Sequence, residues 1–149
     1  VTPAFFASHR QSFVAGLPPD AIAVVRTAPE TSVETSPDPY RQNSDFWYLT
    51  GFGEPDAIAV LRPWAPAGER YILFVAPRDP VKETWTGYRA GVEGARQKLG
   101  AEAAFPLTVA ALRTVFGVEV TPVVDPDIRV DFVIITAEST PQLSPPPAP

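Results

Sequence analysis

The 149-residue chain contains no cysteine, no methionine and a single histidine, and these absences exclude several kinds of site. Without cysteine there is neither a disulfide framework nor a thiolate metal site, which fits a cytoplasmic origin. Because methionine is missing even at position 1, we expect a chain that was trimmed or cut from a longer one. The only histidine, His9, falls on the apolar side of a predicted helix beside Phe5, Phe6 and Phe13. We expect it to pack or to lie at the surface, because catalytic and metal sites need converging partners.

Long apolar runs and an excess of basic residues are missing as well. No run approaches the roughly 20 residues of a membrane-spanning helix, and no charged-then-apolar signal segment opens the chain. The 12 Lys and Arg residues are outnumbered by 17 Asp and Glu residues, which leaves no basic surface for a nucleic-acid backbone or an anionic membrane. We therefore expect a soluble cytoplasmic protein whose partners include neither nucleic acid nor membrane.

What the chain does contain is a series of short apolar runs separated by amphipathic segments. Residues 21–25, 57–61 and 71–75 are rich in β-forming residues and bounded by Pro, Gly or charge, which predicts strands buried on both faces. Helices must cover such strands, and the first is expected to begin at Thr2 and Pro3 and to end near Gly16 and Pro18. Further helices are predicted over residues 45–49, 79–85, 93–99 and 108–116. The predicted class is α/β, a mixed and mostly buried β-sheet flanked by helices.

Three other segments mark the limits of the domain and its surface. Residues 118–124 predict a strand that Pro122 confines to a sheet edge or a bulge. Residues 27–40 are rich in Thr, Ser, Glu and Pro, which predicts a long surface loop. Residues 141–149 are mostly proline and small residues, typical of a stiff tail or linker. We therefore assign one domain to residues 1–140 and a proline-rich tail to residues 141–149.

The most informative segment is residues 41–52, Arg-Gln-Asn-Ser-Asp-Phe-Trp-Tyr-Leu-Thr-Gly-Phe, where a polar cluster is followed directly by an aromatic one. It predicts a short helix capped by Asn43 or Ser44, with Asp45 in the first turn. Gly51 is expected in the left-handed conformation that ends such a helix.

This string closely resembles the signature of the amino-terminal domain of Xaa-Pro aminopeptidases (aminopeptidase P), in the creatinase/prolidase group. Two further stretches agree with it in the same order: Glu-Pro-Asp-Ala at 54–57 before an apolar run, and Arg78-Asp79 leading to Trp-Thr-Gly-Tyr-Arg-Ala-Gly at 85–91. The resemblance extends over about residues 5–124. It implies the fold of that amino-terminal domain, with a ribonuclease-H-like topology, and it favours a helix over residues 132–136, although β-branched residues there favour a strand.

The resemblance also implies a function by association. In this family the two metal ions, expected to be manganese, are bound by two Asp, one His and two Glu of a separate carboxy-terminal "pita-bread" domain. We therefore expect no metal or other cofactor, and no catalytic residue, in this chain. The amino-terminal domain is expected to contribute contacts within a homo-oligomer and a wall of the substrate cleft. Its partner would be the catalytic domain of the same chain or of a neighbouring subunit, which removes the residue before proline.

Roles for the signature residues can be weighed from their chemistry. Arg41, Asn43 and Asp45 offer hydrogen bonds to a ligand, but we favour a structural network that holds the loop onto the following helix, because charges near aromatic residues need partners. Trp47, together with Tyr48 and Phe52, is expected in the core or in inter-domain packing rather than as a platform for a ligand.

The segment 85–91 combines residue types that are enriched at interfaces. Trp85, Tyr88 and Arg89 lie between two glycines, and we expect Trp85 and Arg89 to face a partner or a cleft. The alternative is that Trp85 caps the local core and that Arg89 pairs with Glu83 or Glu93.

Two other functions remain open from the sequence. The chain could be a stand-alone binding or oligomerisation module of the same fold without peptidase activity. It could also be a hydrolase, such as a nuclease, that uses the carboxylates of Asp45, Glu54, Asp56 and Asp79. The acidic balance disfavours the nuclease, because a polyphosphate substrate requires Lys and Arg.

Overall fold

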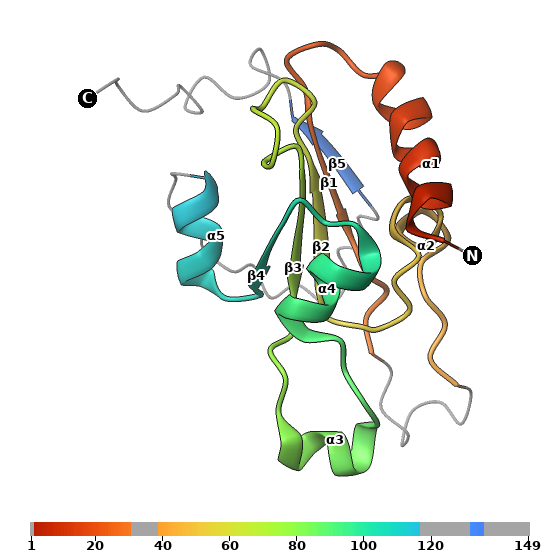
Figure 1. Ribbon diagram of the computed structural model, residues 1–149, viewed down its shortest axis with the longest axis vertical. Coiled ribbons are helices and arrows are strands. Elements are labelled where there is room, and N and C mark those ends of the chain that lie inside the picture. The colour runs from red at the N-terminus through yellow and green to blue at the C-terminus, as the bar shows by residue number, and fades with distance from the viewer. Residues whose placement is uncertain (1, 31–38, 117–131, 136–149) are drawn as a thin grey trace.

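The computed structural model describes residues 2–30, 39–116 and 132–135, and these form a five-stranded sheet with helices on both faces (Figure 1). The strands are β1 (Ile22–Arg26), β2 (Ala57–Leu61), β3 (Tyr71–Val75), β4 (Ala103–Pro106) and β5 (Phe132–Ile135). The helices are α1 (Pro3–Ala15), α2 (Ser44–Thr50), α3 (Pro80–Thr86), α4 (Gly91–Leu99) and α5 (Val109–Phe116). The predicted α/β class, with a mixed sheet between helices, is confirmed.

The strand order is β4-β3-β2-β1-β5. Strands β1, β2 and β3 form an antiparallel meander, with Val24 opposite Val60 and Ile72 opposite Val60 on its other side. The chain then passes through α3 and α4 before β4 pairs parallel with β3. The first three strands lie where the apolar runs predicted them, to within one residue.

Two parts of the sheet differ from the sequence-based expectation. Strand β4 was not predicted, because its four residues, Ala-Ala-Phe-Pro, have no strand-like pattern and are ordered by pairing with β3. The helix expected over residues 132–136 is wrong: Phe132–Ile135 forms β5, antiparallel to β1. The β-branched residues there follow their own preference, and β1 supplies a partner that is more than 100 residues away in sequence.

Alternating side chains divide the interior between two faces. The larger core lies under α1, α2 and α4, and its strand residues are Ala23, Val25, Ala57, Ala59, Leu61, Tyr71, Leu73 and Val75. The opposite face carries Val60, Ile72 and Phe74, which pack with side chains of α5 such as Ala111, Leu112, Val115 and Phe116. Figure 1 shows α5 on one side of the sheet and α1, α2 and α4 on the other.

The helices also follow their predicted ends closely. Pro3 is the first residue of α1 and Gly16 its C-cap, although the side chain of the N-cap Thr2 makes no capping hydrogen bond. Gly100 ends α4 in the left-handed conformation. The strand expected over 118–124 and the tail expected over 141–149 lie outside the described residues. Among the helices that are described, none is both long and apolar enough to cross a membrane.

Candidate interaction site

Helix α2 is formed as its residue types require. The side chain of Asn43 accepts hydrogen bonds from the backbone N–H of Asp45 (2.8 Å) and Phe46 (3.3 Å), which caps the helix, and Asp45 lies in the first turn. Gly51 ends α2 with φ of 65°, and an added Cβ there would overlap the ring of Phe6. Both the cap and the glycine stop were predicted from the sequence.

Gln42 organises the segment around α2, a role that the sequence analysis did not assign. Its Oε1 accepts from the N–H of Ala28 (3.0 Å), the hydroxyl of Tyr40 (2.9 Å) and its neighbour's N–H at Asn43 (2.9 Å). Its Nε2 donates to the carbonyls of Phe52 (3.1 Å) and Glu54 (2.9 Å). One half-buried amide therefore holds together both ends of residues 40–54. The signal that could have found it is a second uncharged amide directly before the cap Asn43, since an amide side chain offers donors and an acceptor at once.

The predicted network around Arg41, Asn43 and Asp45 is only partly correct. Asn43 takes part as the cap, but the side chains of Arg41 and Asp45 are exposed and make no hydrogen bond or ion pair with the described part of the chain. The polar network is instead built on Gln42, because an uncharged amide can be half-buried at lower cost than a guanidinium or a carboxylate.

The aromatic residues of α2 divide between the core and the surface. Phe46 and Phe52 are buried, as expected for Phe52, whereas Trp47 and Tyr48 are 47% and 48% exposed. Trp47 and Tyr48 therefore lie outside the core of this chain, and the other half of the expectation, packing between domains, stays a prediction. A helix of seven residues on a sheet has one inward face, and Phe46, Leu49 and Thr50 occupy it.

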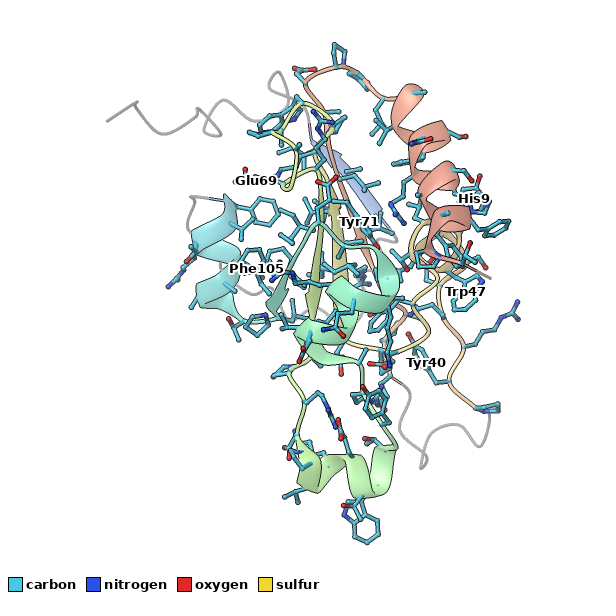
Figure 2. All side chains as sticks on the ribbon, viewed as in Figure 1. His9, Tyr40, Trp47, Glu69, Tyr71 and Phe105 are labelled. Atoms are coloured by element: carbon cyan, nitrogen blue, oxygen red, sulfur yellow. The ribbon has the colours of Figure 1, made fainter. Side chains whose placement is uncertain are left out.

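The exposed rings form a small aromatic patch with the start of α1, which we define as Phe5, His9, Trp47 and Tyr48. The ring of His9 stacks on Tyr48 at 4.0 Å between centroids and lies 4.4 Å from Phe5, and its Nδ1 is 2.8 Å from the carbonyl of Tyr48. His9 thus packs at the surface, as predicted. Figure 2 shows His9 and Trp47 on the outer side of these two helices.

Residues 78–90 form an arm that stands away from the sheet at one end of the molecule (Figure 1). The arm carries α3, which Asp79 caps through hydrogen bonds from Val81 and Lys82, and no residue of α3 is buried. Trp85 is 88% exposed and Tyr88 is 61% exposed. The alternative in which Trp85 caps the local core is therefore wrong, and its side chain is available to a partner.

Ionic and aromatic contacts join the two segments of the arm on either side of α3. Arg78 forms a two-bonded pair with the carboxylate of Glu83, at 2.8 Å for each bond, and its guanidinium lies 4.7 Å from the centroid of Tyr88. The hydrogen bond from Arg78 is the main cause that holds the pKa of Glu83 below its usual value. The guanidinium of Arg89 pairs with Glu30 at 3.7 Å. Among the described residues it forms no ion pair with Glu83 or Glu93, the alternative left open by the sequence, although the backbone N–H of Arg89 donates to Oε1 of Glu83 (3.3 Å). The loop over 27–40 was expected to be surface, and its residue Glu30 meets the arm here.

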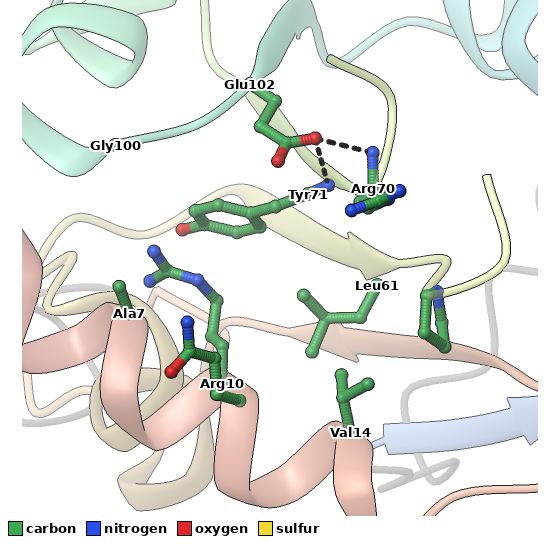
Figure 3. A pocket seen from close by; sticks show the side chains of 10 residues that line it. Ala7, Arg10, Val14, Leu61, Arg70, Tyr71, Gly100 and Glu102 are labelled. Carbon is green, nitrogen blue, oxygen red and sulfur yellow. Dashed lines mark hydrogen bonds between the residues drawn. The ribbon is translucent and has the colours of Figure 1, made fainter. Parts of the chain in front are cut away.

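A pocket of about 420 Å³ lies between α1 and the ends of β2 and β3 (Figure 3). Two of its charged side chains are already engaged: Arg10 donates to the carbonyl of Leu49 (2.8 Å), and Glu102 accepts from the backbone N–H of Arg70 (2.7 Å) and Tyr71 (3.4 Å). The hydroxyl of Tyr71 is enclosed and makes no hydrogen bond to the described residues.

No group of three or more His, Cys, Asp or Glu side chains within the described ranges is placed to hold a metal ion. The described residues therefore do not fit the two-metal site of the resembled family. Glu54, one of the carboxylates considered for a hydrolase, is engaged by a backbone N–H of the arm.

Comparison with known proteins decides the family. The sequence model of the family described as the aminopeptidase P N-terminal domain matches residues 6–116. The chain belongs to this family. It is 43% identical over 100 residues to the Xaa-Pro aminopeptidase of Escherichia coli, an alignment that covers 66% of this chain and 23% of that protein. The Haemophilus influenzae Xaa-Pro aminopeptidase is 49% identical over 69 residues, covering 46% and 16%.

Solved structures agree with the sequence matches. The Pseudomonas aeruginosa aminopeptidase PepP superposes with a TM-score of 0.69 at 38% identity, covering 78% of this chain and 27% of that one. The zinc-substituted E. coli aminopeptidase P in complex with product gives a TM-score of 0.67 at 34% identity, with the same coverage. This aminopeptidase P domain thus spans less than a third of the relatives that it matches.

Proposed function

We propose that this chain acts as the non-catalytic amino-terminal domain of an Xaa-Pro metalloaminopeptidase, and that its arm borders the substrate cleft of a catalytic domain. The parent reaction removes an N-terminal residue that precedes proline. The catalytic domain, in the same chain or in a neighbouring subunit of a homo-oligomer, supplies the metal pair, which we expect to be manganese. Manganese, the oligomer and a cytoplasmic location stay predictions.

The single observation that carries this proposal is the exposure of Trp85 at the end of an arm with no buried helix residue. An indole that is 88% exposed contributes little to the stability of its own domain, so its value lies in contacts outside it. Trp and Arg are the residue types that most often dominate binding energy at interfaces. The arm supplies both, with Tyr88 beside them.

The proposal is tested with Trp85→Ala in this chain and in a longer protein that also carries the catalytic domain. In this chain we expect a change in unfolding free energy within about 0.5 kcal/mol, because surface substitutions rarely exceed that. In the longer protein we expect the KM for long peptides to rise, or the oligomer to weaken, with dipeptide turnover less affected. Sedimentation and steady-state kinetics measure both.

Val81→Ala is the matched control, since Val81 is also strongly exposed on α3 but its side chain offers neither a ring nor a hydrogen-bonding group. Equal effects of the two variants on KM or on assembly would mean that a change to helix α3, and not the loss of the indole, is the cause. Wild-type assembly and kinetics for Trp85→Ala would contradict the cleft role and favour the alternative, a stand-alone binding module. Turnover of an Xaa-Pro dipeptide by this chain alone would contradict its non-catalytic assignment.

A further inference from the structure

The arm makes few hydrophobic contacts with the rest of the domain, so polar interactions must set its direction. None of the residues of α3 is buried, and Figure 1 shows the helix separated from the sheet by two extended segments. The contacts that join the arm to the body are few: Ala90 packs against the core, and the ring centroid of Tyr88 lies 5.2 Å from Nζ of Lys98 in α4. With so few packed side chains, a projecting hairpin samples many orientations. A cleft wall, however, requires one orientation, since a displacement of about 1 Å can already impair a site.

The two ends of the arm come close together where Gly91 faces the side chain of Arg78. Gly91 has φ of 63°, and an added Cβ there would lie 2.6 Å from Cγ of Arg78. Only glycine allows the outgoing and returning segments to approach this closely. This contact holds the two ends of the arm together, but it does not fix the arm relative to the rest of the domain.

Two consecutive backbone N–H groups just before Gly91 each donate a hydrogen bond to a carboxylate. The N–H of Arg89 donates to Oε1 of Glu83 (3.3 Å), and the N–H of Ala90 donates to Oε1 of Glu54 (2.9 Å). Glu83 belongs to α3, so its contact closes the arm on itself. Glu54 lies 36 residues before Ala90, between α2 and β2, so its contact joins the arm to the body of the domain.

Glu54 is itself fixed at its backbone. Its carbonyl accepts the hydrogen bond from Nε2 of Gln42 (2.9 Å), and β2 begins three residues later at Ala57. A chain of hydrogen bonds thus runs from Gln42 through Glu54 to Ala90. Ala90 is the N-cap of α4, where a carboxylate also interacts favourably with the helix dipole.

We propose that Glu54 is a positioning residue, whose carboxylate attaches the base of the arm to the segment between α2 and β2 and thereby sets the direction in which Trp85 points. The ion pair of Arg89 with Glu30 is a weaker second attachment, since it is longer, at 3.7 Å, and half of the Glu30 side chain is exposed. The functional consequence rests on the proposed cleft role of the arm, whereas the attachment itself does not.

The attachment is tested by NMR on this chain with Glu54→Ala, Glu54→Gln and the control Glu93→Ala. Glu93 is an exposed carboxylate in the first turn of the same helix α4, and among the described residues its side chain bonds within that helix, accepting from Nε2 of Gln97 (2.9 Å). In Glu54→Ala we expect amide exchange at Ala90 to accelerate by roughly tenfold, the factor for one lost charge-assisted hydrogen bond. The heteronuclear NOE of the Trp85 indole should fall at the same time.

Glu54→Gln keeps an acceptor oxygen, so its Ala90 exchange rate and its Trp85 indole NOE should stay close to the wild-type values. Glu93→Ala should also leave both quantities unchanged. If Glu54 acted only through its charge on the helix dipole, Glu54→Gln should instead resemble Glu54→Ala, because the charge is lost. If Glu54→Ala does not fold, Glu54→Asp replaces it, since the shorter side chain withdraws the carboxylate from Ala90. Wild-type indole order and wild-type Ala90 exchange in the folded variant would overturn the proposal.

Kinetics of the longer protein separate this inference from the proposed function. A loosened arm with a raised KM for long peptides and an unchanged kcat supports both. A loosened arm with unchanged kinetics supports the attachment and contradicts the cleft role.

Discussion

The guanidinium of Arg10 lies 3.9 Å above the ring of Tyr71 while its Nη1 donates to the carbonyl of Leu49 at 2.8 Å. One side chain from α1 thus meets the end of α2 and the first residue of β3. Burial lowers the pKa of Arg10 and raises the pKa of Tyr71, whose hydroxyl is enclosed. Residues from three separate segments are therefore joined around one buried cation.

Replacing Arg10 by Ala should destabilise the domain by about 2–4 kcal/mol, because the Leu49 carbonyl loses a charged donor and Tyr71 loses a stacked cation. Urea unfolding followed by circular dichroism measures the change. Arg96→Ala removes an exposed guanidinium from α4 and should change stability by less than about 0.5 kcal/mol. Equal values for the two variants would show that Arg10 contributes no more than a surface arginine.

Phe46 and Trp47 are neighbours with opposite burial, so their truncation should have unequal costs. Phe46 is fully buried, and Phe46→Ala should lower the unfolding free energy by about 3–5 kcal/mol. Trp47 is half exposed and touches Phe6 edge-on, so Trp47→Ala should cost only about 1–2 kcal/mol. Thermal unfolding of both variants gives the comparison. A larger loss for Trp47→Ala would mean that its ring is buried in solution.

Gly51 and Gly68 form a matched pair for testing steric fit. Both have positive φ, at 65° and 94°, but only Gly51 lies against a side chain, the ring of Phe6. Each change to Ala should cost about 1–2 kcal/mol for the backbone conformation. Gly51→Ala should cost roughly 1–3 kcal/mol more, because the added methyl overlaps the ring. Identical denaturation midpoints would contradict the contact between α1 and the end of α2.

Acid should release the pair of Arg78 and Glu83. The pKa of Glu83 is held below its usual value of 4.5, chiefly by the hydrogen bond from Arg78. Because the folded-state pKa is depressed, the contribution of the pair is complete above the unfolded value and is lost as the pH falls through the folded one. Carbon-13 NMR titration of the Glu83 carboxyl should therefore show a midpoint below 4.5.

Arg78→Gln provides the control for this titration. It removes the positive charge, so the Glu83 midpoint should move back upward, toward the ordinary glutamate range. A wild-type midpoint at or above the ordinary value would mean that the pair does not persist in solution.

Local sequence determined most of the elements and the family. Strands β2 and β3 and the ends of α2 follow from apolar runs, a capping Asn43 and a left-handed Gly51, because these depend on residues within a few positions of one another. The aminopeptidase P signature is also local, since it is read from residues 41–52 and 85–91.

Only the tertiary structure decided which of these residues work together. It made residues 132–135 a strand by placing them beside β1, and it turned Trp47 and Tyr48 outward because Phe46 and Leu49 fill the inner face of α2. It also brought Glu54 to Ala90, a contact across 36 residues that no spacing rule predicts. Burial and pairing of this kind depend on which surfaces meet after folding, so they are properties of the assembled sheet and helices and not of any short segment.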